Sequence, residues 1–314
     1  MRLGRKPEVA RTTSREVWAI DVPGSGSHSF FAGGSVDVVY VGDGDGVMYT
    51  NLRFRSHSVA DGREVASTRT GTTVRCLTRL PDGDLLVSTD HRLHRLDPRS
   101  LVERQRWERR IPSFADSIAL HGEICAMANW LGPSVSFVNL GDGSVRRRSL
   151  VDLPRVIEGP EGPYLLASRA GGVSKLDVDR GLSTEAFRTT GGRDAIVRLG
   201  LLWLVDGRPR HGVKDQGESS LLRAYDLADG VEVGKVKLPA NVNRLCATDV
   251  GLWARGRDTL VEVRIDGDTR VAGVWAAPSK QTWVAVDPLR RLGLSIPIGL
   301  GGEVTRLTCR ALDE

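Results

Sequence analysis

Long apolar runs, paired cysteines and helical periodicity are all missing from this sequence of 314 residues. No stretch approaches the roughly 18 apolar residues of a membrane span, and the basic start is followed by polar PEVARTTSRE, where a signal peptide needs an apolar segment. The cysteines number four, lie far apart and have no CxxC spacing, which predicts reduced core residues and excludes a zinc motif. We therefore expect a soluble cytoplasmic protein that binds neither a membrane nor a metal ion.

Lysine is scarce as well, with six lysines against 38 arginines. The formal net charge is +5, but residues 1 to 15 hold five basic residues and one acidic residue, so most of the excess lies there. The runs ERQRWERR (103 to 110) and VRRRSL (145 to 150) predict outer strands whose charges discourage edge-to-edge pairing. Because nucleic-acid binding requires a clustered basic face, we expect a flexible basic tail over residues 1 to 15 and no nucleic-acid partner.

Familiar catalytic and ligand-binding motifs are absent too. No G-x-S-x-G elbow occurs. The stretch VYVGDGDGVMY (39 to 49) begins like a calcium loop at Asp43 and Asp45, but Val47 and Phe54 stand where later ligands are needed. A phosphate loop would require a helix after the glycines, and the residues that follow are β-branched and aromatic. Two apolar runs around a glycine turn instead predict a β-hairpin.

The sequence does contain a repeat along its whole length. Each unit has an apolar strand, a short turn, a second apolar strand, a glycine turn, a third strand ending in a corner such as LD or DG, and an outer strand. Seven copies cover residues 28–68, 74–108, 116–150, 154–189, 194–238, 242–276 and 281–314. The last copy stops after three strands, and EVWAIDVPG (16 to 24) has the pattern of the missing fourth.

Pairing of these two ends would close a ring and remove its open sheet edges. The sequence therefore predicts an all-β, seven-bladed β-propeller of four-stranded antiparallel blades over residues 16 to 314. VYVGDGDGVMY followed by VADGREV resembles the pyrroloquinoline-quinone-like propeller repeat, and GLWARG (251 to 256) is similar to streptogramin lyase propellers. The first resemblance implies the same ring architecture. Quinone-binding members contain adjacent cysteines, which this chain does not have, so we expect no cofactor.

Polar residues stand at the start of each innermost strand, where a propeller directs side chains toward its central channel. In ring order they are His28, Arg75, Asp116, Arg155, Asp194, Arg244 and Gln281. The loops between second and third strands add Trp130, Arg169 and Arg255, and Trp283 lies near the seventh position. This set predicts a polar channel mouth whose guanidinium groups suit a carboxylate or phosphate. In the alternative, arginines and aspartates pair across neighbouring blades.

Two functions are compatible with these patterns. The first is a non-catalytic scaffold that presents a loop-rich face to a protein or peptide, because a closed ring supplies a rigid disc with variable loops. The second is an enzyme, such as a lyase, cyclase or hydrolase, acting on a small anionic metabolite at the channel mouth. His28 would be its candidate acid or base. The polar insertion at residues 207 to 220 is long enough to be a contact element or a tolerated surface loop.

Overall fold

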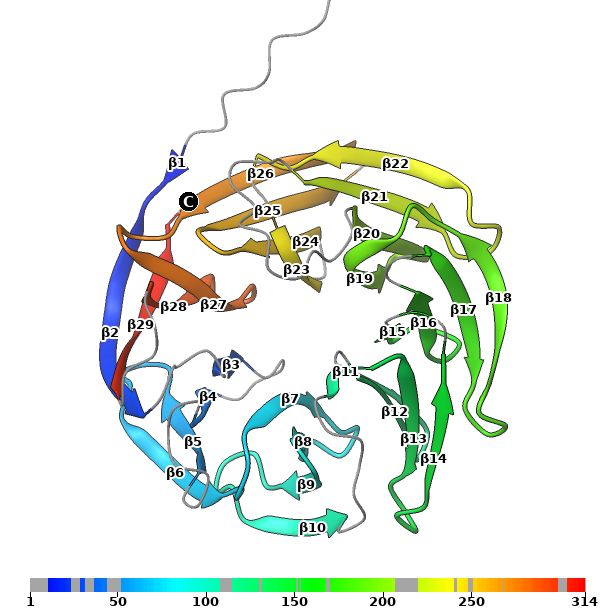
Figure 1. Cartoon of the computed structure of the whole chain (residues 1–314). Coiled ribbons are helices and arrows are strands. Elements are labelled where there is room, and N and C mark those ends of the chain that lie inside the picture. The colour runs from blue at the N-terminus through cyan, green and yellow to red at the C-terminus, as the bar shows by residue number, and fades with distance from the viewer. Residues whose placement is uncertain are drawn as a thin grey trace, which may run out of the picture.

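The computed structural model is a ring of seven β-sheets around a central channel (Figure 1). It describes residues 11–23, 29–31, 37–43, 52–107, 115–129, 132–150, 152, 154–167, 170–206, 220–239, 242–247, 251–266, 268–298 and 304–313. No helix in these ranges is long and apolar enough to cross a membrane. The sheets are antiparallel and follow one another in sequence order, which confirms the predicted seven-bladed propeller.

The first four blades use consecutive strands, which follow one another from the channel outward. Blade one contains β3 (Ser29–Phe31), β4 (Val38–Gly42), β5 (Arg53–Ser58) and β6 (Glu64–Arg69). Blade two contains β7 (Val74–Arg79), β8 (Leu85–Thr89), β9 (Leu93–Leu96) and β10 (Glu103–Trp107). Blade three contains β11 (Ala115–His121), β12 (Ile124–Asn129), β13 (Ser134–Asn139) and β14 (Val145–Ser149). Blade four contains β15 (Pro154–Ile157), β16 (Tyr164–Ala167), β17 (Gly172–Asp177) and β18 (Leu182–Arg188).

The remaining three blades complete the ring. Blade five contains β19 (Gly192–Arg198), β20 (Leu201–Asp206), β21 (Leu221–Asp226) and β22 (Glu232–Lys237). Blade six contains β23 (Val242–Ala247), β24 (Gly251–Gly256), β25 (Thr259–Asp266) and β26 (Asp268–Ala276). Blade seven contains β27 (Gln281–Asp287), β28 (Leu292–Pro297), β29 (Val304–Leu312) and, as its outer strand, β2 (Ser14–Pro23).

The ring is closed by the N-terminal strand, as the sequence predicts. Strand β2 pairs antiparallel with β29, and Trp18 lies opposite Cys309 in that ladder. The pairing begins earlier than expected, at Ser14, and β1 (Arg11–Thr12) adds a parallel strand to the outer edge of blade six. Thr12 Oγ1 donates to the carbonyl of Val274 at 2.9 Å. Residues 11, 12, 14 and 15 therefore belong to sheets, and the boundary expected after residue 15 lies nearer the N terminus.

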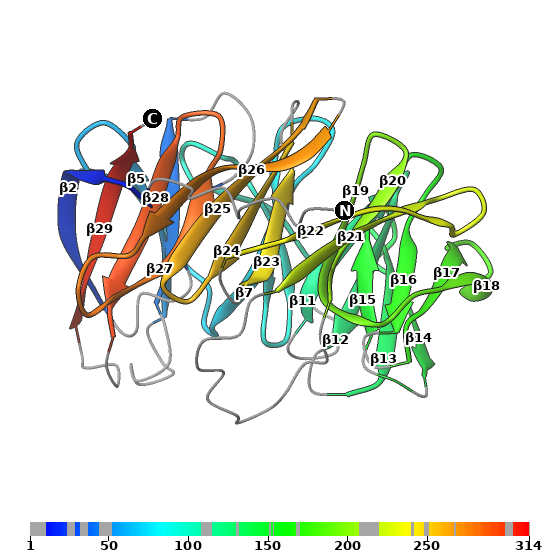
Figure 2. The ribbon, with the colours of Figure 1, turned by 90° about the horizontal axis from the view of Figure 1, so that it is seen from above.

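The core lies between the blades, because each sheet is apolar on both faces. In blade one, Tyr40 and Phe54 stack with ring centroids 5.5 Å apart and pack against Val74 and Leu85 of blade two. Figure 2 shows that the strands cross the thickness of the disc, so their connections collect on two opposite faces. We call the side with the connections between blades and between second and third strands the mouth face. The opposite side is the corner face.

A repeated turn shapes the corner face. The side chain that ends the third strand accepts backbone N–H groups two or three residues later, as Asp97 does from Arg99 and Ser100 at 3.0 and 2.9 Å. Such Asx and Ser turns satisfy the backbone where the chain reverses. In five blades, the residue four positions after this side-chain acceptor has positive φ. These residues are Gly62, Leu101, Gly143, Gly181 and Gly230. The short side-chain acceptor and the positive φ together explain the repeated LD and DG corners of the sequence.

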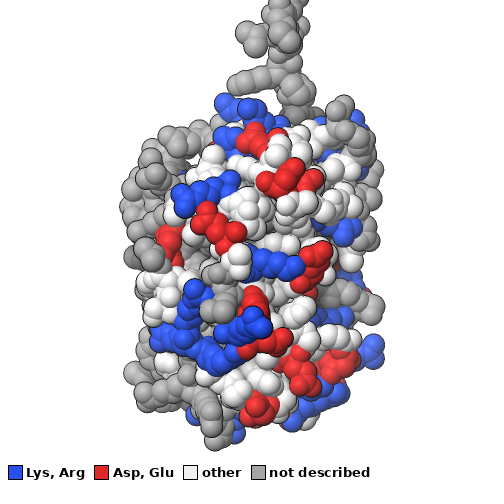
Figure 3. Space-filling view, turned by 90° about the vertical axis from the view of Figure 1, so that its right-hand side faces the viewer, with Lys and Arg blue, Asp and Glu red and all other residues white. Residues whose placement is uncertain are grey.

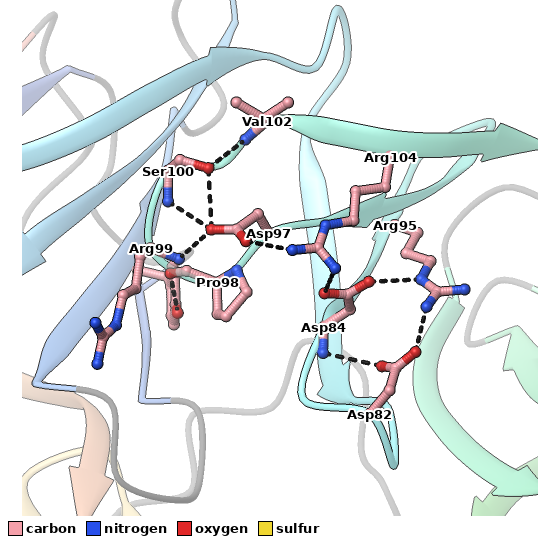
Figure 4. Close-up of polar contacts among 10 residues, drawn as sticks. Asp82, Asp84, Arg95, Asp97, Pro98, Arg99, Ser100, Val102 and Arg104 are labelled. Carbon is pink, nitrogen blue, oxygen red and sulfur yellow. Dashed lines mark hydrogen bonds and ion pairs between the residues drawn. The ribbon is translucent and has the colours of Figure 1, made fainter.

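Figure 4 shows this corner in blade two together with its charged neighbours. The backbone donors, led by Ser100, lower the pKa of Asp97 to about 2. Arg104 donates to Asp97 and bridges to the buried Asp84, which also accepts from Arg95 at 2.6 Å. The acidic corner is thus fixed by two guanidinium groups and by its own backbone.

In blades one to four, the carbonyl of the residue directly after the corner acceptor joins the blade to the preceding one. It accepts from Trp18 Nε1 of blade seven at Val59 (2.6 Å) and from Tyr40 Oη of blade one at Pro98 (2.7 Å). Equivalent bonds run from Gln105 of blade two to Leu140 O (3.3 Å) and from Arg146 of blade three to Val178 O (2.5 Å). The hydrogen bond that Trp18 of the N-terminal strand makes to blade one therefore uses an acceptor equivalent to those that join blades one to four.

The closure can be tested with two truncations. A chain starting after Thr12 loses only β1 and should lose about 1 kcal/mol of unfolding free energy, the value of one or two hydrogen bonds. A chain starting after Pro23 also loses buried Trp18 and Val22 and the whole β2 ladder, so we expect a loss of several kcal/mol. Urea denaturation measures both. Equal losses would contradict closure by β2.

The hairpin between β19 and β20 offers a stabilising substitution. Its two turn residues, Leu199 and Gly200, both have positive φ, the geometry of a turn that prefers Asn-Gly. The Leu199 side chain is 55% exposed, so little burial is lost on replacement. We expect Leu199→Asn to raise the unfolding free energy by about 0.5–1 kcal/mol, measured by urea denaturation. Leu199→Val is the control and should destabilise, and an Asn variant no more stable than wild type would refute the assignment.

Candidate functional site

The mouth of the channel is shaped by bulges in the innermost strands. The ladder skips one residue between Val74 and Cys76, between Ala115 and Ser117, between Gly192 and Asp194, and between Val242 and Arg244. In blade four the described ladder begins at Pro154 and is regular, and there Arg155 pairs directly with Leu166. A bulge re-aims side chains. Arg75 and Asp116 are themselves the bulged, unpaired residues of their strands. The ladder-paired positions that follow the start of the strand hold Arg155, Asp194 and Arg244 in blades four, five and six. The seven predicted positions are therefore not all equivalent.

Two of the predicted arginines are paired with aspartates. Arg75 Nε lies 2.5 Å from Asp90 Oδ1 within blade two. Arg155 of blade four contacts Asp194 of blade five, with Nη2 and Oδ1 2.9 Å apart. The other oxygen of Asp194 accepts the backbone N–H of Leu245 in blade six at 2.8 Å. Asp194 thus joins three consecutive blades beside the channel, as the cross-blade alternative predicts for this pair.

Arg244 and Arg255 lie opposite each other in blade six. Burial and, to a smaller extent, the charge of Arg244 together lower the pKa of Arg255 to about 10, while Asp194 opposes the shift. Arg255 remains a cation at neutral pH and donates to the carbonyls of Trp283 and Val284 in blade seven. This guanidinium therefore fastens blade six to blade seven.

The structure places the other predicted residues differently or leaves them outside its description. Trp283 is buried, against the expectation that it would line the mouth, because its ring packs with Trp253 and Trp275 and over Gly293. Gln281 Oε1 accepts from Ser295 Oγ at 2.7 Å. Three predicted residues fall outside the described ranges, namely His28, Trp130 and Arg169. Asp116 lies in β11, but its side chain is not described, and the insertion at 207 to 220 is described only from Ser220.

Asp43, the first acid of the predicted hairpin, is buried and engaged on both oxygens. One oxygen accepts the N–H of Arg53 at 2.8 Å, and the other is bonded to the Arg55 guanidinium. Residues 44 to 51 lie outside the described ranges. Among the described residues, no group of three or more His, Cys, Asp or Glu is arranged to hold a metal ion. The role of Asp43 is instead to bind Arg55.

This pairing recurs in blade five and gives a motif that the sequence analysis missed. Arg55 also lies near Glu64 (3.5 Å), and Arg223 contacts Asp206 at 2.9 Å and Glu232 at 2.6 Å. The ladders put these two arginines at the same place in their blades, on the side facing the preceding blade. The available signal was the acid nine positions after each arginine.

Blade two has a variant of the same arrangement. His94 occupies the position of the arginine, and its Nδ1 lies 2.7 Å from Glu103, again nine positions later. Burial lowers the pKa of His94, against the opposing effect of Glu103. Three blades therefore have a basic side chain, arginine or histidine, beside a carboxylate at this position.

Blade four leaves the same position open. Its ladders place Ser174 where blades one and five have arginine, and Ala167 where they have aspartate. A groove of about 250 Å³ lies there, between blades three and four. The residues that line it include Leu150, Asp152, Leu165, Ala167, Ser174 and Glu185. The groove is smaller than the roughly 300–1,000 Å³ of small-molecule pockets, which suits it to a single side chain.

The rim beside this groove carries no field of one sign. Figure 3 shows basic and acidic side chains interspersed over the face that contains the right-hand side of the ring in Figure 1. Several of these charges are paired locally, including Lys175 with Glu161 (2.7 Å) and Arg188 with Glu185 (2.7 Å).

Comparison with known proteins supports the architecture. No family model matches the sequence, and no curated protein matches it. The fold is similar to the WD40 domain of Pan2 from Neurospora crassa, with TM-score 0.67 and 9% identity over 98% of both chains. It is also similar to the C-terminal WD40 domain of Sif2, with TM-score 0.62 and 12% identity over 97% of this chain and 100% of that one. BamB from Moraxella catarrhalis gives TM-score 0.50 and 10% identity over 87% and 82%.

At these identities the comparisons show a shared propeller fold and nothing finer. The identification is therefore architectural: a seven-bladed propeller.

The role of Asp194 can be measured directly. Asp194→Ala removes the acceptor of both Arg155 and the Leu245 N–H, so we expect a loss of about 2–4 kcal/mol in unfolding free energy. Arg155→Met leaves the bond to Leu245 intact and should cost about half as much. Urea denaturation of both variants, with Asp194→Asn as the variant that keeps a neutral acceptor, tests the assignment. Equal losses for Ala and Asn would show that the bond between blades contributes nothing.

Proposed function

We propose that the protein is a non-catalytic interaction scaffold that presents its mouth face to a protein or peptide partner. The main support is that the predicted mouth arginines Arg75, Arg155 and Arg255 are engaged by groups of the protein itself, within a blade or between blades. Arg75 and Arg155 bind aspartates, and Arg255 binds carbonyls of the next blade. The alternative function, an enzyme acting on a small anionic metabolite, would need these guanidinium groups to face a ligand.

The fold adds a second line of support. The WD40 domains of Pan2 and Sif2 cover this chain almost completely, and a closed disc with variable connections is a general platform for recognition. We further propose that the protein acts in the cytoplasm. The four free cysteines, Cys76, Cys125, Cys246 and Cys309, are compatible with a reducing compartment.

Photo-crosslinking from both faces of the disc tests the scaffold. A photoreactive amino acid replaces Ala170, which is exposed on the mouth face, or Ala228, which is exposed in a corner of blade five. In cells that naturally make the protein, we expect a discrete crosslinked partner from position 170 and none from position 228. The partner identified by mass spectrometry is then purified and should bind wild type with a measurable Kd. Absence of a crosslink at position 170, or the same products at both positions, would refute the proposal.

A further inference from the structure

The groove between blades three and four is the place where other blades keep an arginine of their own. In blades one and five, Arg55 and Arg223 lie on the side of the sheet that faces the preceding blade, and carboxylates hold their guanidinium groups. The ladders give the corresponding position of blade four to Ser174. A hydroxymethyl group occupies far less space than an arginine side chain, and the resulting space is the groove of about 250 Å³.

The walls of the groove keep the chemistry that suits an arginine. Leu165, Ala167 and Leu150 give an apolar surface, against which the aliphatic part of an arginine can pack. Glu185 lies directly opposite Ser174 in the ladder between β17 and β18, and Asp152 lines the same groove. Carboxylates of this kind form strong paired hydrogen bonds with a guanidinium. Blade four therefore has no arginine of its own at this position but has two acids, Asp152 and Glu185, in the groove.

We propose that this groove receives an arginine side chain from a protein partner, which occupies the position that Arg55 and Arg223 fill in their own blades. The inference rests on the proposed scaffold function and specifies one contact within it. An arginine is preferred to a purely apolar side chain because two carboxylates, Asp152 and Glu185, line the groove beside one basic residue, Arg188. It is preferred to a small metabolite because the volume matches one side chain.

Arg188 is the charge that an incoming arginine must accommodate. It pairs with Glu185 at 2.7 Å, but the two side chains are 76% and 52% exposed. The same hydrogen bond lowers the pKa of Glu185, so this carboxylate is ionised at neutral pH. Because exposed ion pairs contribute little net free energy, a partner's guanidinium can share or take over Glu185 at small cost.

Peptide binding by the full chain tests the proposal. The probes are Ac-Gly-Ser-Xaa-Ser-Gly-NH2 peptides with arginine or norleucine at Xaa, titrated into ¹⁵N-labelled protein and followed by NMR. With the arginine peptide we expect saturable shifts of the Ala170 and Ser174 amides, and at least about tenfold weaker binding of the norleucine peptide. No saturable shift up to about 10 mM arginine peptide, or equal binding of both peptides, would overturn the proposal.

A self-filling variant makes the test specific. Ser174→Arg places in blade four the arginine that blades one and five already have, so it should abolish the shifts while the melting temperature confirms folding. Thr184→Arg is the matched control, because it adds the same charge to the adjacent strand at a residue next to Glu185 and therefore on the opposite face. This control should bind the arginine peptide as wild type does. Undiminished binding by a folded Ser174→Arg variant would overturn the proposal.

Glu185→Gln provides a second variant if Ser174→Arg fails to fold. Glu185 is exposed, so its replacement should preserve the fold while weakening the arginine peptide selectively. Unchanged arginine binding in this variant would count against the groove. The arginine site and the scaffold function can fail independently. A partner that crosslinks at position 170 and binds normally to Ser174→Arg refutes the arginine site but leaves the scaffold function intact.

Discussion

Four joints of the ring share one kind of acceptor, the backbone carbonyl that follows the third-strand corner in blades one to four. An Asx or Ser turn fixes the corner, and a side chain of the preceding blade then donates to it, as Trp18 does to Val59 and Gln105 to Leu140. Each such bond is worth only about 1 kcal/mol on its own, yet it sets the angle between neighbouring sheets. The apolar faces between blades can pack only when that angle is correct, so the local turn and the global ring support each other.

The channel mouth uses charge for the same purpose. Asp194 connects blades four, five and six through Arg155 and the Leu245 N–H, and Arg255 carries the connection to blade seven. Buried ionic groups of this kind fix an arrangement more than they add net stability. A mouth built in this way is rigid, and a rigid frame is what an interaction surface needs if its loops are to be presented in one geometry. The groove of blade four lies at the position that a basic side chain and a carboxylate fill in blades one, two and five.

The sequence was sufficient to predict the number of blades, because apolar strands and corner motifs recur in seven copies. It was also sufficient to predict the closing strand, because EVWAIDVPG has the pattern of the outer strand that the seventh copy lacks. It was insufficient for the mouth. A one-residue bulge changes the face on which a side chain lies, so Arg75 and Asp116 could not be aligned with Arg155 from spacing alone. Trp283 was placed at the mouth for the same reason and is buried. The groove at Ser174 required knowing which residues of blades one and five share its position in the ladder.

The closing strand has a consequence for biosynthesis. Strand β2 emerges from the ribosome before blade one, but its ladder partner β29 emerges only after all the intervening blades, since Trp18 lies opposite Cys309. Until then, the faces of Trp18 and Val22 that the ring buries stay open to solvent or to a chaperone. Blades one to six can assemble as the ribosome releases them, because each uses consecutive strands. The seventh blade can be completed only after β29 has emerged, so a chain that stalls before that point remains an open arc.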